Sequence, residues 1–130
     1  MPVITLGQSP LASDRLARPL SPAVRAGDFV FVSGTVPTDE QGQVVQGGIE
    51  AQTRQVFKRL EEALALADCT LADVAKVNVW LDDPRDFGSF NRVYMECFGE
   101  HRPARSTVES RLMIDAKVEI DVTAYKPQAK

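Results

Sequence analysis

The most constraining feature of the sequence is the strict alternation of apolar and acidic residues in Val118-Glu119-Ile120-Asp121-Val122. Successive side chains of a β-strand point to opposite faces, so this run predicts a strand with one apolar face and one carboxylate face. Ala75-Lys76-Val77-Asn78-Val79-Trp80-Leu81 alternates in the same way. The two runs predict a sheet with one buried face, and its other face needs a separate explanation.

Two segments between these strands have helical spacing instead. The apolar side of the first helix consists of Ile49, Thr53, Val56, Leu60, Ala63, Leu64 and Ala67. These residues recur at intervals of three and four, with charged residues opposite them. Asp83 precedes Pro84 and is a typical N-cap followed by proline at the first helical position. The sequence therefore predicts a second helix that begins there and ends near Gly99.

The N-terminal part of the chain predicts a β-hairpin after an irregular segment. Residues 1–18 are rich in proline and polar residues, and we expect them to be an irregular lead-in. Ala23-Val24-Arg25 and Phe29-Val30-Phe31-Val32 then flank a turn at Gly27. A short strand around Arg105 completes the order ββ-α-β-α-ββ. This order predicts an α+β sandwich in residues 1–130, with one mixed, mostly antiparallel sheet and two helices on one face.

The bulk properties exclude several classes of protein. The chain has 130 residues, enough for one domain with its own core, and a net charge of −3. Its basic residues are scattered among acidic ones, which disfavours a nucleic-acid partner. No apolar run approaches the length of a membrane span, and the N-terminus lacks a signal-peptide core. We expect a cytoplasmic protein with Cys69 and Cys97 as free thiols, since neither has ligand spacing around it.

The two predicted faces of the sheet differ in chemistry. The helix-facing positions are predicted to be Val77, Val79, Leu81, Val118, Ile120 and Val122. The opposite face is then predicted to carry Trp80, Arg105, Thr107, Glu119 and Asp121. Such a mixture of an indole, a guanidinium, a hydroxyl and carboxylates makes a poor core. We expect this face to form a subunit interface that contains a pocket.

The residues of this face suggest the chemistry. Arg105 offers a planar fork that binds a carboxylate by two hydrogen bonds, but a structural ion pair with Glu119, Asp121 or an interface acid stays open. Glu119 could activate water, and a merely solvated strand carboxylate is the alternative. Thr107 adds a hydroxyl, and His101 suits a helix-capping contact better than catalysis. The sequence has no metal-binding, phosphate-binding or nucleophile motif, so we expect neither a metal nor another cofactor.

Several short fragments along the chain form a recognisable set: Phe31-Val32-Ser33-Gly34-Thr35-Val36-Pro37, Gln52-Thr53-Arg54-Gln55-Val56, Asp86-Phe87, Phe90-Asn91-Arg92-Val93-Tyr94, Phe98-Gly99-Glu100-His101, Pro103-Ala104-Arg105-Ser106 and Val118-Glu119-Ile120. Because these fragments occur together and in this order, the chain resembles the RidA (YjgF) family of reactive-intermediate deaminases from about Pro19 to Tyr125. The resemblance implies a chorismate-mutase-like fold. It also implies a homotrimer with clefts between its subunits.

The resemblance also implies an activity and roles for particular residues. Family members hydrolyse 2-imino acids and their enamine tautomers, such as 2-aminoacrylate and 2-iminobutanoate, to 2-keto acids and ammonia without a cofactor. Arg105 resembles the arginine that binds the substrate carboxylate, and Glu119 the glutamate that positions or activates water. Gly34 resembles a position that offers backbone groups to the ligand. Phe87 and Asn91 resemble residues that line the cleft.

Two positions depart from the family pattern. Leu20 stands where close relatives of the archetype have tyrosine, which makes that wall of the substrate site more apolar. Thr107 stands where many members have cysteine and keeps a polar atom. The change at Leu20 leaves open a bulkier substrate, or a non-catalytic trimer that binds small molecules such as 2-keto acids. RNA cleavage, also attached to this family, is disfavoured by the acidic charge balance and the single histidine.

Overall fold

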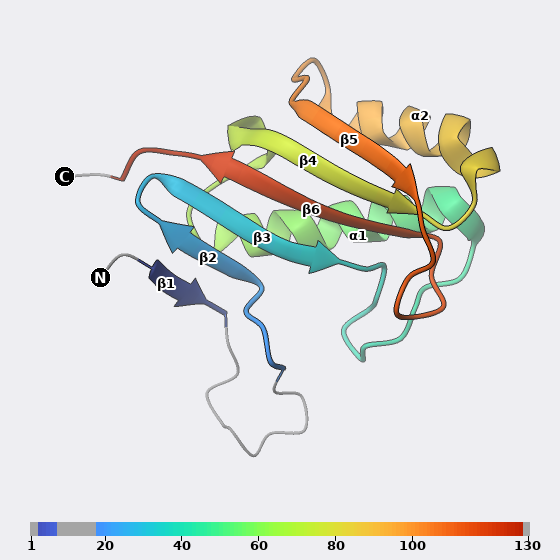
Figure 1. Ribbon diagram of the computed structural model, residues 1–130, viewed down its shortest axis with the longest axis horizontal. Helices are drawn as coiled ribbons and strands as arrows, with labels where there is room; N and C mark the ends of the chain where they lie inside the picture. The colour runs from blue at the N-terminus through green and yellow to red at the C-terminus, as the bar shows by residue number, and fades with distance from the viewer. Residues whose placement is uncertain (1–2, 8–17, 129–130) are drawn as a thin grey trace.

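The structure is a computed structural model that describes residues 3–7 and 18–128. The strands within these ranges are β1 (Val3–Leu6), β2 (Ala23–Ala26), β3 (Phe29–Thr35), β4 (Val74–Leu81), β5 (Ala104–Glu109) and β6 (Val118–Tyr125). The helices are α1 (Gly48–Ala65) and α2 (Phe87–Phe98), and the short 3₁₀ turns are η1 (Leu71–Asp73) and η2 (Pro84–Asp86). Figure 1 shows these elements as one sheet backed by the helices.

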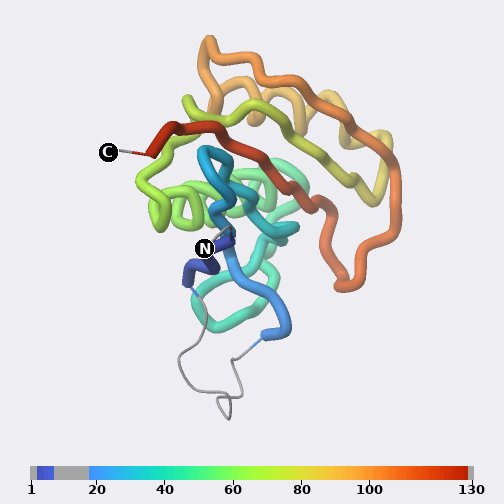
Figure 2. The backbone as a smooth tube through the Cα atoms, turned by 60° about the vertical axis from the view of Figure 1, so that its left-hand side comes forward, coloured from blue at the N-terminus to red at the C-terminus, as the bar shows by residue number. Residues whose placement is uncertain are grey.

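The described strands form one sheet in the order β1-β2-β3-β6-β4-β5. β4 and β5 are parallel, and all other neighbours are antiparallel. β6, red in Figure 2, lies in the middle of the sheet between β3 and β4. The predicted mixed, mostly antiparallel sheet is therefore confirmed.

Both helices cover the same face of the sheet (Figure 1). The predicted apolar side of α1 is buried against β3 and β6. α2 packs beside α1, where the Phe57 ring meets the Tyr94 and Phe98 rings edge-on at 5.8 and 5.5 Å. The strand positions predicted to face the helices on β4 and β6 are all at most 3% exposed. The structure thus confirms the α+β class, with two helices on one face.

The predicted N-cap Asp83 caps a 3₁₀ turn and not α2 itself. The Asp83 carboxylate accepts a hydrogen bond from the Arg85 backbone N–H, but the turn that it caps is η2, which leads directly into α2. At the other end, Gly99 follows Phe98 with φ of 67°, a conformation that glycine adopts without strain. Neither helix of the described ranges is long and apolar enough to cross a membrane.

The predicted irregular lead-in is wrong at its start. Val3–Leu6 form β1, which pairs antiparallel with β2 from Val3↔Ala26 to Leu6↔Ala23. Val, Ile and Thr at these positions favour extended backbone, and β2 would otherwise leave an unpaired edge. Residues 8–17 of the expected lead-in lie outside the described residues.

The face of the sheet that the helices leave open carries exposed aromatic side chains. Phe29 and Phe31 on β3 and Tyr125 on β6 are 44%, 46% and 47% exposed. The Phe29 ring lies 6.4 Å from Phe31 and 5.1 Å from Tyr125 between centroids. A contiguous exposed apolar patch of this kind is typical of an interaction surface.

Candidate functional site

Arg105 on β5 is held by one side of α2. Phe87, Phe90, Asn91 and Tyr94 have the spacing that places residues on one helix face. The guanidinium carbon Cζ lies 4.6 Å from the centre of the Tyr94 ring and 5.7 Å from the centres of Phe87 and Phe90. Nη1 donates a hydrogen bond of 2.9 Å to Asn91 Oδ1. We call these four α2 residues the Arg105 cage.

The cage contains no acidic group. The ion pairs among the described residues are Arg54–Glu96, Arg85–Asp83, Arg92–Glu50 and Lys126–Asp73, and Arg105 takes part in none of them. The alternative of an ion pair with Glu119 or Asp121 within the same chain is therefore wrong. Aromatic faces stabilise a guanidinium without neutralising it. The positive charge of Arg105 thus has no counter-charge within the described part of this chain.

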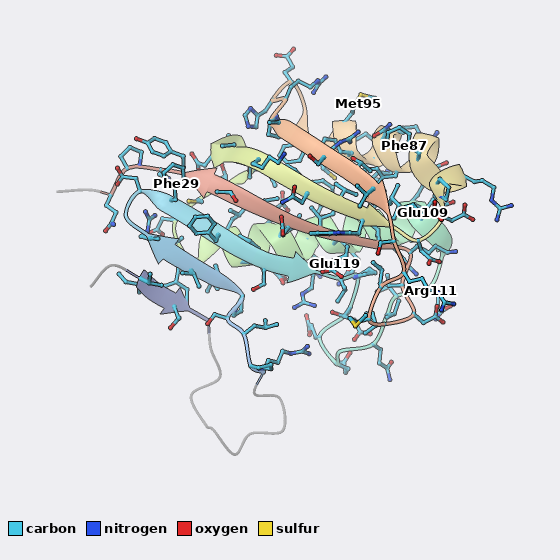
Figure 3. The ribbon with its side chains drawn as sticks, in the orientation of Figure 1. Phe29, Phe87, Met95, Glu109, Arg111 and Glu119 are labelled. Atoms are coloured by element: carbon cyan, nitrogen blue, oxygen red, sulfur yellow. The ribbon has the colours of Figure 1, made fainter. Side chains whose placement is uncertain are left out.

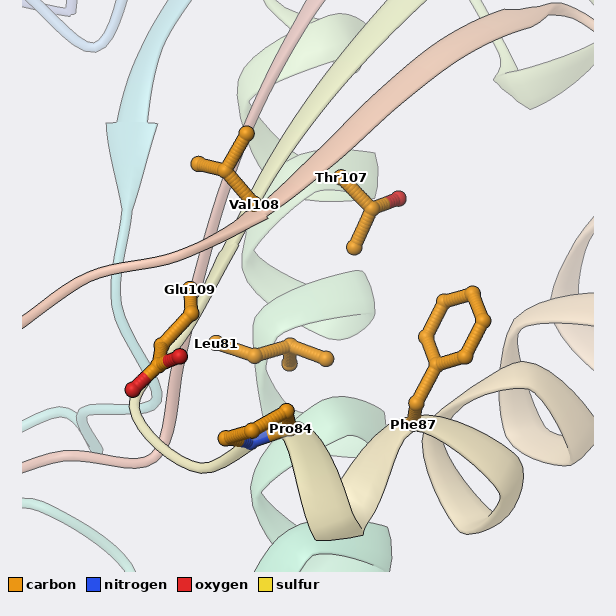
Figure 4. Close-up of a pocket in the computed structure, with 6 residues that line it drawn as sticks. All are labelled: Leu81, Pro84, Phe87, Thr107, Val108 and Glu109. Carbon is orange, nitrogen blue, oxygen red and sulfur yellow. The ribbon is translucent and has the colours of Figure 1, made fainter.

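A small hollow adjoins the cage. It has a volume of about 190 Å³ and is lined by Leu81, Pro84, Phe87, Thr107, Val108 and Glu109. In Figure 4 the Phe87 ring rises from α2 toward Thr107, and Leu81 and Pro84 lie beneath them. Phe87 belongs to both the hollow and the cage, so the hollow is next to Arg105. A group bound at Arg105 would have an apolar space beside it.

Glu119 lies in a second polar cluster, on β6. A Cβ added at Gly34 would overlap Glu119 Oε2 and lie 3.2 Å from its Cδ, so glycine at this position makes room for the carboxylate. Partial burial raises the pKa of Glu119, and the negative charge of Asp121 raises it further. Burial also raises the pKa of Asp121, against the opposing effects of its hydrogen bond from Asn78 and the Lys76 charge. A carboxylate with a raised pKa is a better proton acceptor near neutral pH.

The prediction that Arg105 and Glu119 share a face of the sheet is wrong. Arg105 is paired with Val77, which is buried beneath the helices, and Thr107 is likewise paired with Val79. Glu119 is paired with Trp80, which directly follows Val79 on β4. Because successive side chains of a strand alternate, Trp80 and Glu119 lie on the face opposite to Arg105 and Thr107. The predicted open-face placement of Trp80, Glu119 and Asp121 is confirmed. Figure 3 shows Glu119 on the open face and Phe87 on α2 behind the sheet.

The remaining candidate residues divide between the two clusters. Asn91, Phe87 and Thr107 lie with Arg105 on the α2 side. The Ser33 hydroxyl and backbone N–H donate hydrogen bonds to the carbonyls of Ser21 and Pro22, so the chain just after Leu20 lies beside Ser33, the neighbour of Gly34. The Leu20 side chain is half exposed. A single chain therefore presents two half-sites on opposite faces of its sheet.

Sequence reasoning did not assign a site role to Phe90 or Tyr94. The two residues enter the sequence analysis only within a fragment that carries the resemblance, and their helical spacing from Phe87 was the available signal. The hydroxyls of Tyr94 and Thr107 are the two buried side-chain polar atoms without a hydrogen-bond partner among the described residues. Such atoms are rare in folded proteins. Both belong to residues next to Arg105: Tyr94 through the cage and Thr107 two positions along β5.

Histidine and metal ligands do not gather at either half-site. His101 Nε2 makes a 2.7 Å hydrogen bond with the Val74 carbonyl, so its side chain fastens the segment before β5 to β4. Within residues 3–7 and 18–128, no three His, Cys, Asp or Glu side chains are grouped closely enough to hold a metal ion. The groups available for chemistry are therefore the guanidinium, the carboxylates and the hydroxyls described above.

Comparison with known proteins identifies the family to which this fold belongs. Residues 12–126 match the family described as Endoribonuclease L-PSP. A RutC family protein of Pyrococcus horikoshii is 47% identical over 110 residues, which are 83% of this chain and 87% of the relative. A protein of Acinetobacter baylyi named 3-aminoacrylate deaminase RutC is 40% identical over 109 residues, 82% of this chain and 86% of the relative.

Solved structures give the same result. A crystal structure named as a putative endoribonuclease from Thermotoga maritima has a TM-score of 0.85 and 37% identity, and the match covers 96% of this chain and 98% of that one. The family match begins after β1, and the structural match covers nearly the whole chain. The chain therefore belongs to the Endoribonuclease L-PSP family, which is the YjgF/RidA family.

Proposed function

We propose that the protein hydrolyses 2-imino acids and their enamine tautomers, of the 2-iminobutanoate and 2-aminoacrylate type, to 2-keto acids and ammonia. The observation that carries this proposal is Arg105, whose charge is held by aromatic rings and an amide with no carboxylate partner. The relative named 3-aminoacrylate deaminase gives independent support, because its named substrate is also an enamine acid.

In this proposal Arg105 binds the substrate carboxylate. A guanidinium can donate two parallel hydrogen bonds to a carboxylate, and one Arg105 nitrogen is already fixed by Asn91. The apolar hollow beside the cage would accept the substrate side chain. Because the anchor is rigidly held, the imine carbon would be presented in one orientation.

Glu119 activates the attacking water in this proposal. The enamine first tautomerises to an imine, and its protonated form is electrophilic at carbon. Water adds to that carbon as Glu119 takes a proton from the water, and Glu119 then returns this proton to the nitrogen. The C–N bond of the protonated carbinolamine breaks, and Glu119 accepts the hydroxyl proton as the carbonyl forms. The departing ammonia takes this proton and leaves as ammonium. The reaction consumes one water and needs no redox cofactor.

The proposal requires two copies of the chain at each site. Arg105 and Glu119 lie on opposite faces of the sheet, so one chain cannot direct both at the same small substrate. The exposed aromatic patch on the open face is suited to a contact with a second copy. We therefore propose a homotrimer in which each cleft combines Arg105 of one subunit with Glu119 and Gly34 of its neighbour.

The first test measures removal of imino acids. An amino-acid oxidase generates a panel of small and large 2-imino acids, and semicarbazide traps whatever the protein leaves. We expect the parent to reduce the semicarbazone signal. Arg105→Gln should lower kcat/KM by about 100-fold, because a bidentate charged contact is lost. Arg54→Gln is the matched control, since Arg54 makes a surface ion pair with Glu96 outside the cage.

Two outcomes would contradict the proposal. If a folded Arg105→Gln variant hydrolysed imino acids as fast as the parent, Arg105 would not be the carboxylate anchor. A parent that binds 2-oxobutanoate saturably but removes none of the imino acids would favour the alternative of a non-catalytic binding protein. The feature of this chain that favours this alternative is Leu20, which stands in the place of the family tyrosine.

A further inference from the structure

The Tyr94 side chain has an unusual environment for a buried tyrosine. Its ring packs between Phe57, Phe90 and Phe98, with ring centroids 5.8, 5.6 and 4.8 Å away. A phenol placed among aromatic rings usually has a partner for its hydroxyl. Among the described residues, the Tyr94 hydroxyl makes no well-aligned hydrogen bond, although it is shielded from solvent.

Leaving this hydroxyl unpaired is unfavourable for folding. A buried polar group without a partner destabilises a protein, because its hydrogen bonds to water are lost and not replaced. Phenylalanine would fill the same space among Phe57, Phe90 and Phe98 without that penalty. A purely structural role therefore does not account for the hydroxyl, and a functional explanation is needed.

The only charged group in the cage is Arg105. Its guanidinium lies over the Tyr94 ring at 4.6 Å, the shortest of the three ring contacts. Burial raises the pKa of Tyr94, and the positive charge of Arg105 and a side-chain hydrogen-bonding contact with Arg105 both act against that rise. The guanidinium therefore already approaches the hydroxyl. A guanidinium has five N–H donors, and the structure records a hydrogen bond for Nη1 to Asn91.

We propose that Tyr94 is a positioning residue whose hydroxyl accepts a hydrogen bond from Arg105 when the guanidinium binds an anionic ligand. Asn91 binds one nitrogen of the guanidinium, and the Tyr94 ring packs against the guanidinium plane. Binding of a carboxylate turns the guanidinium toward the ligand, and its contact with the Tyr94 hydroxyl becomes a well-aligned hydrogen bond in that state. This inference rests on the proposed role of Arg105 as the carboxylate anchor.

The inference predicts opposite effects of Tyr94→Phe on binding and on stability. The variant keeps the ring beneath the guanidinium and removes only the hydroxyl. We expect its dissociation constant for 2-oxobutanoate to rise about tenfold by calorimetry, since one hydrogen bond to a charged group is lost. We expect its melting temperature to equal or exceed that of the parent, because an unsatisfied polar atom is gone.

The matched control is Arg54→Gln, which removes only a surface ion pair with Glu96 and should bind 2-oxobutanoate like the parent. Tyr125 and Tyr94 are the two tyrosines of the chain. A spectrum of Tyr125→Phe therefore assigns the two signals of protein labelled with ¹³C at tyrosine Cζ. On addition of 2-oxobutanoate, the Tyr94 signal should shift saturably in the parent and stay in place in Arg105→Gln.

The possible results separate the two proposals. If Arg105→Gln abolishes binding while Tyr94→Phe binds like the parent, the positioning role is wrong and the anchor stands. If Tyr94→Phe binds weakly but also melts several degrees lower, the hydroxyl is structural and the inference is overturned. If Arg105→Gln binds 2-oxobutanoate as tightly as the parent, the anchor fails, and the role of Tyr94 fails with it.

Discussion

At the scale of single residues, the neighbouring Glu119 side chain explains why position 34 is a glycine. The Glu119 carboxylate takes the volume that a Cβ would fill. The obstacle is the end of a flexible side chain, so a substitution at Gly34 would move Glu119 with little change in the backbone. The role of Gly34 in this structure is therefore to permit one position of the Glu119 side chain.

Gly34→Ala is expected to lower kcat/KM by about 10–100-fold, because displacing a catalytic group by about 1 Å has an effect of this size. Its melting temperature should stay close to that of the parent. Gly88→Ala is the control, since a Cβ there meets nothing within 4 Å. In a Glu119→Gln background, Gly34→Ala should have no further effect. An undiminished loss of activity in that background would show that Gly34 does not act through Glu119.

At the scale of secondary-structure elements, the sequence predicts where strands occur. It predicts less well to which face of the sheet the side chains of an edge strand point. β4 and β6 alternate between apolar and polar residues, so their buried faces could be predicted from Val77, Val79, Val118 and Ile120. β5 has no such alternation, and its register with β4 decides which way Arg105 points. The open-face placement of Arg105 rested on the alternation of side chains within single strands, which does not fix the direction of β5. The register instead turns Arg105 toward α2 and its aromatic cage.

The carboxylates of β6 make a prediction about pH dependence. The Asp121 charge raises the pKa of Glu119, and removing that charge should lower it. Glu119 acts in its ionised form, so activity is lost as pH falls through its pKa. Asp121→Asn is therefore expected to move the acidic limb of the kcat/KM profile to lower pH. The profile would be measured with the semicarbazide-coupled removal of 2-iminobutanoate.

Asp115→Asn provides the control for this shift. Asp115 is an exposed carboxylate in the loop before β6 and takes part in none of the described ion pairs. The substitution changes the net charge by the same amount as Asp121→Asn. An equal shift in both variants would mean that the effect comes from net charge, and an unchanged limb in Asp121→Asn would disconnect Glu119 from the profile.

At the scale of the whole molecule, the separation of the two half-sites is the main result that the sequence could not provide. The resemblance to RidA proteins assigned Arg105 and Glu119 to one substrate site. The alternation of side chains within single strands predicted that both residues lie on one face of the sheet. The sheet register instead places the guanidinium among the helices and the carboxylate on the open side. Both residues can serve one substrate only if a second chain supplies one of them.

Mixing two inactive variants tests this arrangement. Arg105→Gln and Glu119→Gln are each expected to lose nearly all activity as pure proteins. In trimers assembled from equal amounts of both, about one quarter of the clefts would combine an intact Arg105 with an intact Glu119 from the neighbouring subunit. Co-refolded mixtures should therefore recover about one quarter of the parental rate, measured by removal of 2-iminobutanoate. If both residues acted within one chain, every site would lack one of them, and the mixture would stay as inactive as its components.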